Sequence, residues 1–342
     1  MEEQNGIWRE YIKLNLLGTS SYGTVYKARS KKDHKIVAIK EYSKFQKGSK
    51  EVYPNEMKYL DLLKSEYIIY YIHKTETEDN WYIIRDYYWG TLEEFTKMHP
   101  RGVPPKEIQK ILLDLSNSFR LLNQKQLINK DIKPSNILLS FDGKNGYKAI
   151  LSGIHLTQPL GEEDNSQPRG MRYICPPEGL KGEKMDMKYD VWSVGILIYF
   201  MVLRKYPFEG KRDMVILNQI EKGVNMDISD DADLNDLLKK TLQIDVSKRI
   251  SWNDFFNHPF LKKEFNLKKK KKNIGINEMS EQISQLKRDY EETKRISQCV
   301  RDYGNIIKPH VDERIDKDYQ NYVSKKMREI YSKFDEILKN LN

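Results

Sequence analysis

One short segment constrains this chain more than any other feature of its sequence. Residues 128–139 read INKDIKPSNILL. Within six positions they bring together a carboxylate, a lysine, a proline and an asparagine, namely Asp131, Lys133, Pro134 and Asn136. This combination at this spacing is too specific to arise often by chance, and the rest of the sequence is interpreted around it.

The hydrophobic pattern changes near Gly90. Before it, β-type runs are predicted to be strands at 11–17, 24–28, 35–42, 67–72 and 81–84. A helix is predicted to begin at Pro54. After Gly90 the chain is mostly helical, with an amphipathic helix following Pro105 and an apolar, buried helix at Asp190–Leu203. A strand-rich part followed by a helical part indicates the α+β class.

Size and composition exclude several classes of protein. A chain of 342 residues with 39% hydrophobic residues can form about two domains with a real core. The longest uncharged apolar run, 194–203, is far shorter than the ~18–20 residues that cross a bilayer, so no transmembrane segment is predicted. The first ten residues lack the pattern of a secretory signal. Cys175 and Cys299 form no metal or disulfide pattern, which fits a reducing cytoplasm or the nucleus.

Positive charge is concentrated near the end of the chain. Of the net charge of +9, residues 262–272 supply +6, from seven lysines and one glutamate. The rest is nearly balanced, so no nucleic-acid partner is predicted. Residues 263–275 are predicted to form a Lys-rich linker, either solvated or in contact with an anionic surface. Residues 276–342, with apolar positions every three or four residues, are predicted to form an amphipathic helical extension. It would be a helical hairpin on the preceding domain, or a coiled coil for dimerisation or partner docking.

A glycine-bearing turn lies between the first two predicted strands. Leu17–Val25 reads LGTSSYGTV, with glycines at Gly18 and Gly23. Such a turn lets backbone N–H groups approach phosphate oxygens, although alone it also fits an ordinary β-hairpin. The next strand ends at Lys40, after the apolar residues 37–39. A glycine turn and a buried lysine together predict a nucleotide site.

These segments together resemble the eukaryotic protein kinase family. Besides residues 128–139, the resemblance rests on Pro-Pro-Glu at 176–178, Asp-Val-Trp-Ser-Val-Gly at 190–195 and His-Pro-Phe at 258–260. It covers roughly residues 8–262, almost all of the chain before the linker. Lys133 followed by Pro134 favours the serine/threonine branch of the family.

The resemblance implies a bilobal fold. A small β-rich N-lobe would span about 8–85, a hinge about 85–92 and a large helical C-lobe about 93–262. The resemblance also implies that Arg249 pairs with Glu178 inside the C-lobe.

The resemblance further implies a role for each matching residue. A nucleotide would be covered by the glycine turn and its adenine held between apolar side chains, which involves Gly18, Gly23, Val25, Ala38 and Leu138. Lys40 would hold the α- and β-phosphates of ATP, oriented by Glu56. Asp131 would accept the proton of a substrate hydroxyl, and Lys133 would steady the γ-phosphate. Asn136 would ligate Mg²⁺.

The family's metal-binding Asp-Phe-Gly aspartate is missing. Either Leu151-Ser152-Gly153 replaces the motif, or two residues are deleted before Gly153. Both alignments lack the aspartate, and no acidic residue stands between Asp142 and Glu162. Leucine and serine cannot neutralise the charge that develops on the phosphates. Loss of such an electrostatic anchor commonly costs on the order of 10²-fold in rate.

Other family positions also differ. Asn129 and Lys130 replace the usual His-Arg pair, and Ser20 stands where the middle glycine of the turn is expected. Met171 takes the place of a threonine that helps to position the substrate. Arg85 falls at the back wall of the adenine site or one residue away from it, where a bulky cation is unusual. The residues that hold the fold are thus kept, while those for metal and activation are lost.

The sequence therefore predicts a serine/threonine-kinase-like pseudokinase. It would bind ATP with weak or absent Mg²⁺, be catalytically impaired, and act as a scaffold or allosteric regulator of an unidentified protein partner. The alternative is an active serine/threonine kinase that transfers the γ-phosphate of ATP to a protein hydroxyl with atypical metal coordination. In that case Asn136 holds the metal together with a rescuing carboxylate such as Asp142.

Overall fold

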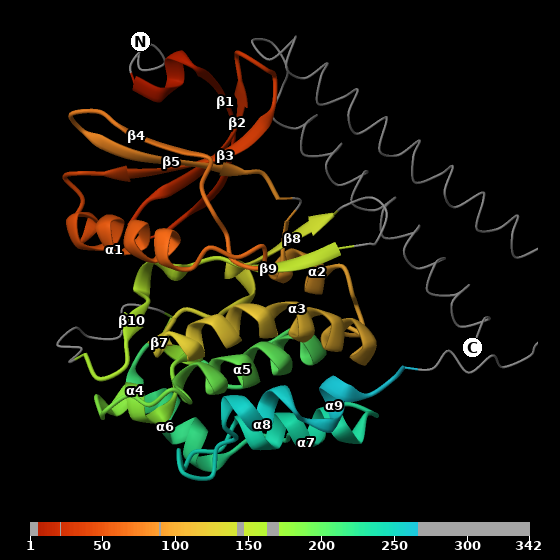
Figure 1. The fold of residues 1–342 in the computed structure, drawn as a ribbon. Coiled ribbons are helices and arrows are strands. Elements are labelled where there is room, and N and C mark those ends of the chain that lie inside the picture. Colours follow the sequence, from red (N-terminus) through yellow and green to blue (C-terminus); the bar gives the residue numbers. More distant parts are fainter. Residues whose placement is uncertain (1–5, 21, 89, 142–146, 163–170, 266–342) are drawn as a thin grey trace, which may run out of the picture. The chain divides into compact units, whose positions relative to one another are not determined.

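The computed structural model describes residues 6–20, 22–88, 90–141, 147–162 and 171–265. Figure 1 shows a β-sheet with helix α1 on one side of the view and a mostly helical part next to it. This is the α+β, two-lobed architecture that the sequence predicts. Residues 276–342 and most of the linker fall outside the described residues, so the helical extension stays a prediction.

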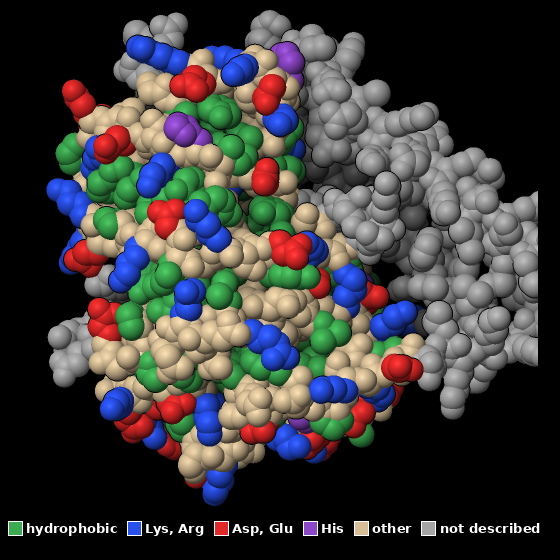
Figure 2. Space-filling view, viewed as in Figure 1, with side chains coloured by type: hydrophobic (Ala, Val, Ile, Leu, Met, Phe, Trp, Pro, Cys, Tyr) green, Lys and Arg blue, Asp and Glu red, His purple; other side chains and the backbone are tan. Residues whose placement is uncertain are grey.

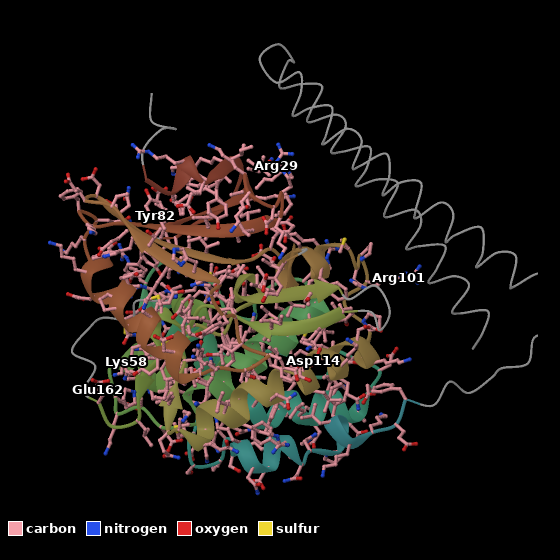
Figure 3. All side chains as sticks on the ribbon, turned by 45° about the horizontal axis from the view of Figure 1, so that its top comes forward. Arg29, Lys58, Tyr82, Arg101, Asp114 and Glu162 are labelled. Atoms are coloured by element: carbon pink, nitrogen blue, oxygen red, sulfur yellow. The ribbon has the colours of Figure 1, made fainter. Side chains whose placement is uncertain are left out.

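The N-lobe sheet is antiparallel and has the strand order β1-β2-β3-β5-β4. Its strands are β1 (Tyr11–Thr19), β2 (Thr24–Ser30), β3 (Ile36–Ser43), β4 (His73–Glu76) and β5 (Asn80–Asp86). Its outer face carries an apolar cluster that packs against η2 (Gly6–Arg9), made of Ile7, Trp8, Ala28, Val37, Ile39, Tyr82 and Ile84. Tyr82 is labelled in Figure 3. Because this cluster occupies the outer face, the opposite, inner face of the sheet is available to polar side chains.

Two predictions for the N-lobe are wrong in detail. Residues 67–72 form no strand: Ile68 makes one isolated bridge with Leu151, and β4 begins only at His73. Helix α1 (Ser49–Leu62) begins before Pro54 instead of at it. Proline is tolerated there because the carbonyl to which it cannot donate belongs to Lys50, at an exposed position in the first turn.

The C-lobe is built from helices around α5. The helices are α2 (Leu92–Lys97), α3 (Pro105–Gln124), α4 (Pro177–Lys181), α5 (Tyr189–Leu203), α6 (Asp213–Lys222), α7 (Ala232–Thr241), α8 (Trp252–Phe256) and α9 (Pro259–Lys262). α5 is buried over almost its whole length, as its apolar composition predicts. α3 starts with Pro105, whose missing N–H would have no intrahelical partner at that position anyway.

Short strands and turns of the C-lobe position the segment 128–139. They are β6 (Gly90–Thr91), β7 (Leu127–Ile128), η3 (Pro134–Asn136), β8 (Ile137–Phe141), β9 (Tyr147–Leu151), η4 (Ile154–Leu156), β10 (Gln158–Pro159) and η5 (Arg172–Ile174). β8 pairs with β6 and β9, and β7 pairs with β10. These two small sheets hold residues 129–136 beside residues 151–157, which are distant in sequence.

The surface of the described residues shows no single dominant charge. Figure 2 shows acidic and basic side chains interspersed over the visible face. In the part of the chain that the structure describes, none of the helices is both long enough and apolar enough to span a membrane.

A buried ion pair fastens α4 to the chain before α8. Arg249 is 1% exposed, and two of its guanidinium nitrogens lie 2.6 and 3.0 Å from the carboxylate oxygens of Glu178. Arg249 also donates to the backbone carbonyls of Lys188 and Gln243. The pairing implied by the family resemblance is confirmed. Because these donors are well satisfied, the pair offsets much of the cost of burying its charges.

We expect Arg249→Met to lower the free energy of unfolding by about 3–5 kcal/mol, because it leaves the Glu178 carboxylate buried and unpaired. The double variant Arg249→Met/Glu178→Met removes both charges and should lose less stability. Urea denaturation followed by circular dichroism measures both. Equal losses in the single and double variants would contradict the ion-pair account and assign the effect to packing.

Candidate functional site

The register of the N-lobe sheet brings the predicted nucleotide residues to one face. Val25 is opposite Lys40 across β2 and β3, and Ala38 is opposite Arg85 across β3 and β5. Residues that are directly opposite, or two apart along a strand, share a face of a sheet. Val25, Ala38, Lys40 and Arg85 therefore lie together on the inner face.

Three apolar side chains predicted to contact a nucleotide keep some accessible surface. Val25 and Ala38 are partly exposed on the sheet. In β8, Leu138 is partly exposed while its neighbours Ile137 and Leu139 are fully buried, so Leu138 points the other way from them. Surfaces of this kind can contact the two faces of a flat heterocycle.

A buried carboxylate organises the inner face. Glu56 of α1 is 0% exposed, and its Oε2 accepts a hydrogen bond from Lys40 Nζ at 2.8 Å. The hydroxyl of Tyr42 donates to the same oxygen, and the Arg85 guanidinium donates to Oε1. Burial alone would raise the pKa of Glu56, but the charges of Lys40 and Arg85 outweigh it and hold the pKa well below its usual range. Glu56 is therefore ionised and shared by three donors.

The glycine turn is closed by a serine. The hydroxyl of Ser20 accepts from the backbone N–H groups of Tyr22 and Gly23, at 3.3 and 3.2 Å, and donates to the carbonyl of Gly23 at 3.0 Å. A Cβ on Gly23 would lie 2.6 Å from the carbonyl oxygen of Glu41, so this position needs glycine. Gly18, by contrast, has open space around it. The serine hydroxyl thus occupies N–H groups that such a turn can offer to a phosphate.

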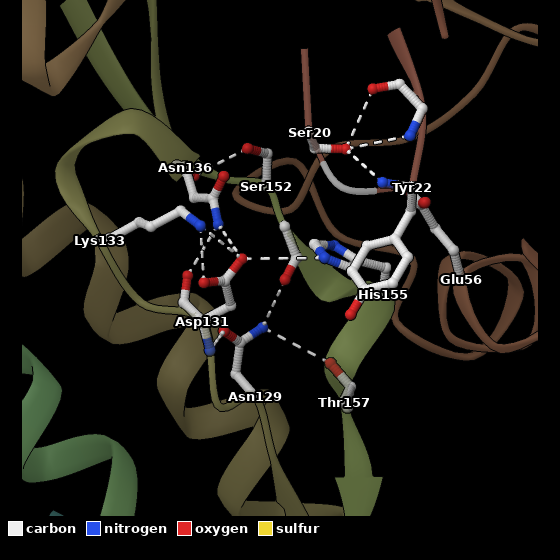
Figure 4. Close-up of polar contacts among 12 residues, drawn as sticks. Ser20, Tyr22, Glu56, Asn129, Asp131, Lys133, Asn136, Ser152, His155 and Thr157 are labelled. Carbon is white, nitrogen blue, oxygen red and sulfur yellow. Dashed lines mark hydrogen bonds and ion pairs between the residues drawn. The ribbon is translucent and has the colours of Figure 1, made fainter. Parts of the chain in front are cut away.

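Asp131, Lys133 and Asn136 converge in the C-lobe (Figure 4). The carboxylate of Asp131, 1% exposed, accepts from Lys133 Nζ at 2.8 and 3.0 Å. It also accepts from Asn136 Nδ2 at 2.6 Å. Burial raises the pKa of Asp131 despite these donors. The three predicted residues therefore form one hydrogen-bonded group.

The backbone before Asp131 is anchored from α5. The carboxylate of Asp190 accepts from the N–H groups of Asn129 and Lys130, at 2.6 and 2.9 Å. Burial raises the pKa of Asp190 to about 6. The Asn129 side chain accepts from the N–H of Asp131 at 3.0 Å. These contacts fix where the Asp131 carboxylate points.

Residues 151–153, where a metal-binding carboxylate is expected, carry none and lie beside Asn136. Leu151 is the last residue of β9, and its side chain is fully buried. Ser152 follows it, and both its N–H and its hydroxyl donate to the carbonyl of Asn136 at 2.8 Å. At Gly153, with φ of 68°, a Cβ would lie 2.2 Å from Asn136 Nδ2. Ser152 is therefore hydrogen-bonded to the main chain of Asn136, and residues 151–153 bring no carboxylate to it.

The donor set around Asn136 does not fit Mg²⁺ well. Magnesium in proteins is usually held by one or two carboxylates together with phosphates and water. Here Asn136 offers an amide, and Asp131 is already hydrogen-bonded to Lys133. Within the described ranges, no group of three or more His, Cys, Asp or Glu side chains could hold a metal. Asp142, the rescuing carboxylate considered from sequence, lies outside the described residues.

Sequence reasoning missed two residues that join the lobes. Asn55 of α1 donates to the carbonyls of His155 and Thr157, at 2.9 and 3.0 Å, and so ties α1 to η4. The His155 ring lies 3.9 Å from Asp131 Oδ2 and 5.8 Å from the ring of Tyr22. Burial, with the charge of Lys40, lowers the pKa of His155 to about 3, which keeps it neutral. A single histidine in a short 3-10 helix carries no sequence pattern that could have revealed this.

Comparisons with known proteins agree with this geometry. The family model described as "Protein kinase domain" matches residues 11–261. Serine/threonine-protein kinase ULK3 of Xenopus laevis is 31% identical over 265 residues, which is 74% of this chain and 55% of that protein. Serine/threonine-protein kinase ATG1c of Arabidopsis thaliana is 27% identical over 268 residues, 74% of this chain and 35% of that protein. The chain thus spans about half, or less, of the length of these relatives.

We expect Glu56→Gln to lower the free energy of unfolding at pH 7 by about 3 kcal/mol, because Lys40 and Arg85 are left buried without their counter-charge. The pKa of Glu56 is lower in the folded than in the unfolded chain. Its stabilising effect is therefore present above the ordinary glutamate pKa and is lost as the pH falls toward the folded value. The difference in the free energy of unfolding between parent and variant should therefore become smaller as the pH is lowered. Urea denaturation measured from pH 7 to about pH 3 tests this.

Glu93→Gln is the matched control for this prediction. Glu93 pairs with Lys97 on the surface of α2, so the change should alter stability by less than about 1 kcal/mol. A loss for Glu56→Gln no larger than for Glu93→Gln, or a gap that does not depend on pH, would contradict the account.

Proposed function

The chain belongs to the protein kinase domain family, and from this premise we propose that it is a nucleotide-binding member with impaired phosphoryl transfer. Its role would be that of a scaffold or allosteric regulator of a protein partner. The single observation that carries the proposal is Ser152 beside Asn136, in a site whose Lys40–Glu56 pair is complete.

Nucleotide binding is supported by the inner face. Lys40 is held by Glu56 at 2.8 Å, which positions a cation for phosphate oxygens. Accessible apolar surface on Val25, Ala38 and Leu138 suits the faces of a purine. These contacts need no metal ion, so ATP would bind with little help from Mg²⁺.

Impairment is supported by the charges that are missing. During phosphoryl transfer, negative charge spreads over the oxygens of the transferred group. Kinases neutralise this charge with metal ions held by carboxylates. Ser152 supplies no charge, and the turn N–H groups are shared with the hydroxyl of Ser20. Losing one electrostatic anchor of this kind typically costs about 10²–10³-fold in rate.

A second candidate is an active serine/threonine kinase. The observation in its favour is Asp131, whose carboxylate is oriented by Lys133 and Asn136 and could accept the proton of a protein hydroxyl. The names of the relatives, serine/threonine-protein kinases, point the same way. In this reading the metal would need a carboxylate from outside the described residues, such as Asp142.

The proposal also includes a cellular location and a role for the C-terminal residues. A cytoplasmic location, or a nuclear one through the Lys-rich linker 263–275, is proposed from composition. Dimerisation or docking through residues 276–342 is proposed from their apolar repeat.

The proposal predicts that restoring one carboxylate will restore metal dependence. Calorimetric titration with ATP should give parent Kd values within about twofold of each other in EDTA and in Mg²⁺. In Ser152→Asp, Mg²⁺ should tighten ATP binding by about tenfold or more, because the new carboxylate can share the ion with Asn136 and the phosphates. Ser152→Asn, of similar size but neutral, should behave like the parent.

Two results would overturn the proposal. Parent protein that binds no ATP would remove the nucleotide role. A parent whose ATP affinity already depends tenfold or more on Mg²⁺ would favour the active kinase.

A further inference from the structure

Arg85 is the unusual residue of the inner face, because it adds a second cation beside Glu56. It lies in β5 directly opposite Ala38 of β3, one residue before the strand ends at Asp86. Opposite residues of an antiparallel pair point to the same side. The register therefore places the side chain of Arg85 next to that of Ala38, and not one residue away from it as an alternative alignment allowed. This side chain is 8% exposed, so its charge is buried.

The two oxygens of the Glu56 carboxylate have different partners. Oε1 accepts a hydrogen bond from the terminal nitrogen Nη2 of Arg85. Oε2 accepts from Lys40 Nζ at 2.8 Å and from the hydroxyl of Tyr42. A guanidinium bound to a carboxylate is a charge-assisted pair, so Arg85 can neutralise Glu56 without Lys40. Lys40 can therefore move away from Oε2 without leaving a buried carboxylate unpaired.

This buried group carries one more positive than negative charge. Among the described residues, Lys40 and Arg85 both form their ion pair with Glu56. Burial lowers the pKa of Lys40, the charge of Glu56 opposes this effect, and the charge of Arg85 adds to it. A surplus of buried positive charge is unfavourable on its own, and an anion would balance it. The phosphates of a nucleotide are such an anion.

We propose that the two cations have separate roles: Arg85 holds Glu56, and with it α1, while Lys40 is available to bind phosphate oxygens. Arg85 is then a positioning residue that acts through Glu56, and its charge takes part of the place of a metal ion. Docking of α1 onto the sheet needs neither Lys40 nor a bound nucleotide. The phosphate role of Lys40 rests on the proposed function of the site, whereas the docking role of Arg85 does not.

Hydrogen exchange followed by mass spectrometry tests the docking role on the amides of α1. In Lys40→Met, the protection of α1 should fall by about threefold or less, because Glu56 keeps Arg85 and Tyr42. In the double variant Lys40→Met/Arg85→Met it should fall by about a hundredfold or more, since the carboxylate has lost both cations. The amides of α5, in the C-lobe, are the internal reference and should keep the protection they have in the parent.

Calorimetric titration with ATP in EDTA tests the phosphate role. Arg85→Met should weaken ATP binding by about tenfold, because Lys40 then has to serve both Glu56 and the phosphates. The amides of α1 should stay protected in this variant, since Glu56 keeps Lys40 and Tyr42. Arg85→Lys keeps the charge without the planar fork and should bring the Kd back to within about threefold of the parent value.

The chain offers a matched control in another arginine of the sheet. Arg29 of β2 lies opposite Ile36, at the other end of β3 from Lys40, and is labelled at the edge of the molecule in Figure 3. Its Nε is buried, as that of Arg85 is. Arg29→Met should change neither the Kd for ATP nor the protection of α1 by more than about twofold.

Each outcome decides one of the two roles. Protection of α1 that is already lost in Lys40→Met, or that is the same in the single and the double variant, would overturn the docking role of Arg85. ATP affinity that is unchanged in Arg85→Met, or is not recovered in Arg85→Lys, would overturn the phosphate role. A parent that binds no ATP overturns the proposed function and the phosphate role together, while the exchange experiment still decides the docking role. Should the double variant fail to fold, Lys40→Met alone decides it.

Discussion

The described structure depends on one buried carboxylate. Glu56 receives hydrogen bonds from Lys40 and Tyr42 of β3 and from Arg85 of β5, and thereby ties α1 to the sheet. Burying an ion without partners would cost several kcal/mol, and these donors offset that cost. Asn55, the neighbour of Glu56, then ties the same helix to η4. Helix α1 is thus held from both lobes by adjacent residues.

This arrangement changes the electrostatics of the family's site. Positive charge comes from Lys40, Lys133 and the additional Arg85, while Ser152 brings none of the negative charge that would hold a metal ion. A site with surplus cations suits the phosphates of a nucleotide directly. It suits a divalent metal poorly, because the metal would meet an amide and a hydroxyl instead of carboxylates. This balance of charge is the basis of the proposal that the site binds nucleotide but is impaired in transfer.

Much of this could be predicted from the sequence, because the decisive residues sit in segments with specific spacing. The segment 128–139 indicated the family. The ion pairs Lys40–Glu56 and Arg249–Glu178, which the resemblance implies, are both present. Other contacts could not be predicted. Asn55 and Thr157 are 102 residues apart and belong to no periodic pattern. The direction of Arg85 depends on strand register, which one residue of misalignment would reverse. The roles of the linker and extension stay predictions, since those residues lie outside the described ranges.

The central claim is that the chain holds nucleotide without transferring its phosphate. Intact-mass spectrometry of the purified chain, incubated with ATP and either Mg²⁺ or Mn²⁺, tests this most directly, with Asp131→Asn as the control. The account predicts no added phosphate in the parent or in the control. Phosphate additions in the parent that are absent from Asp131→Asn would contradict it and identify an active kinase.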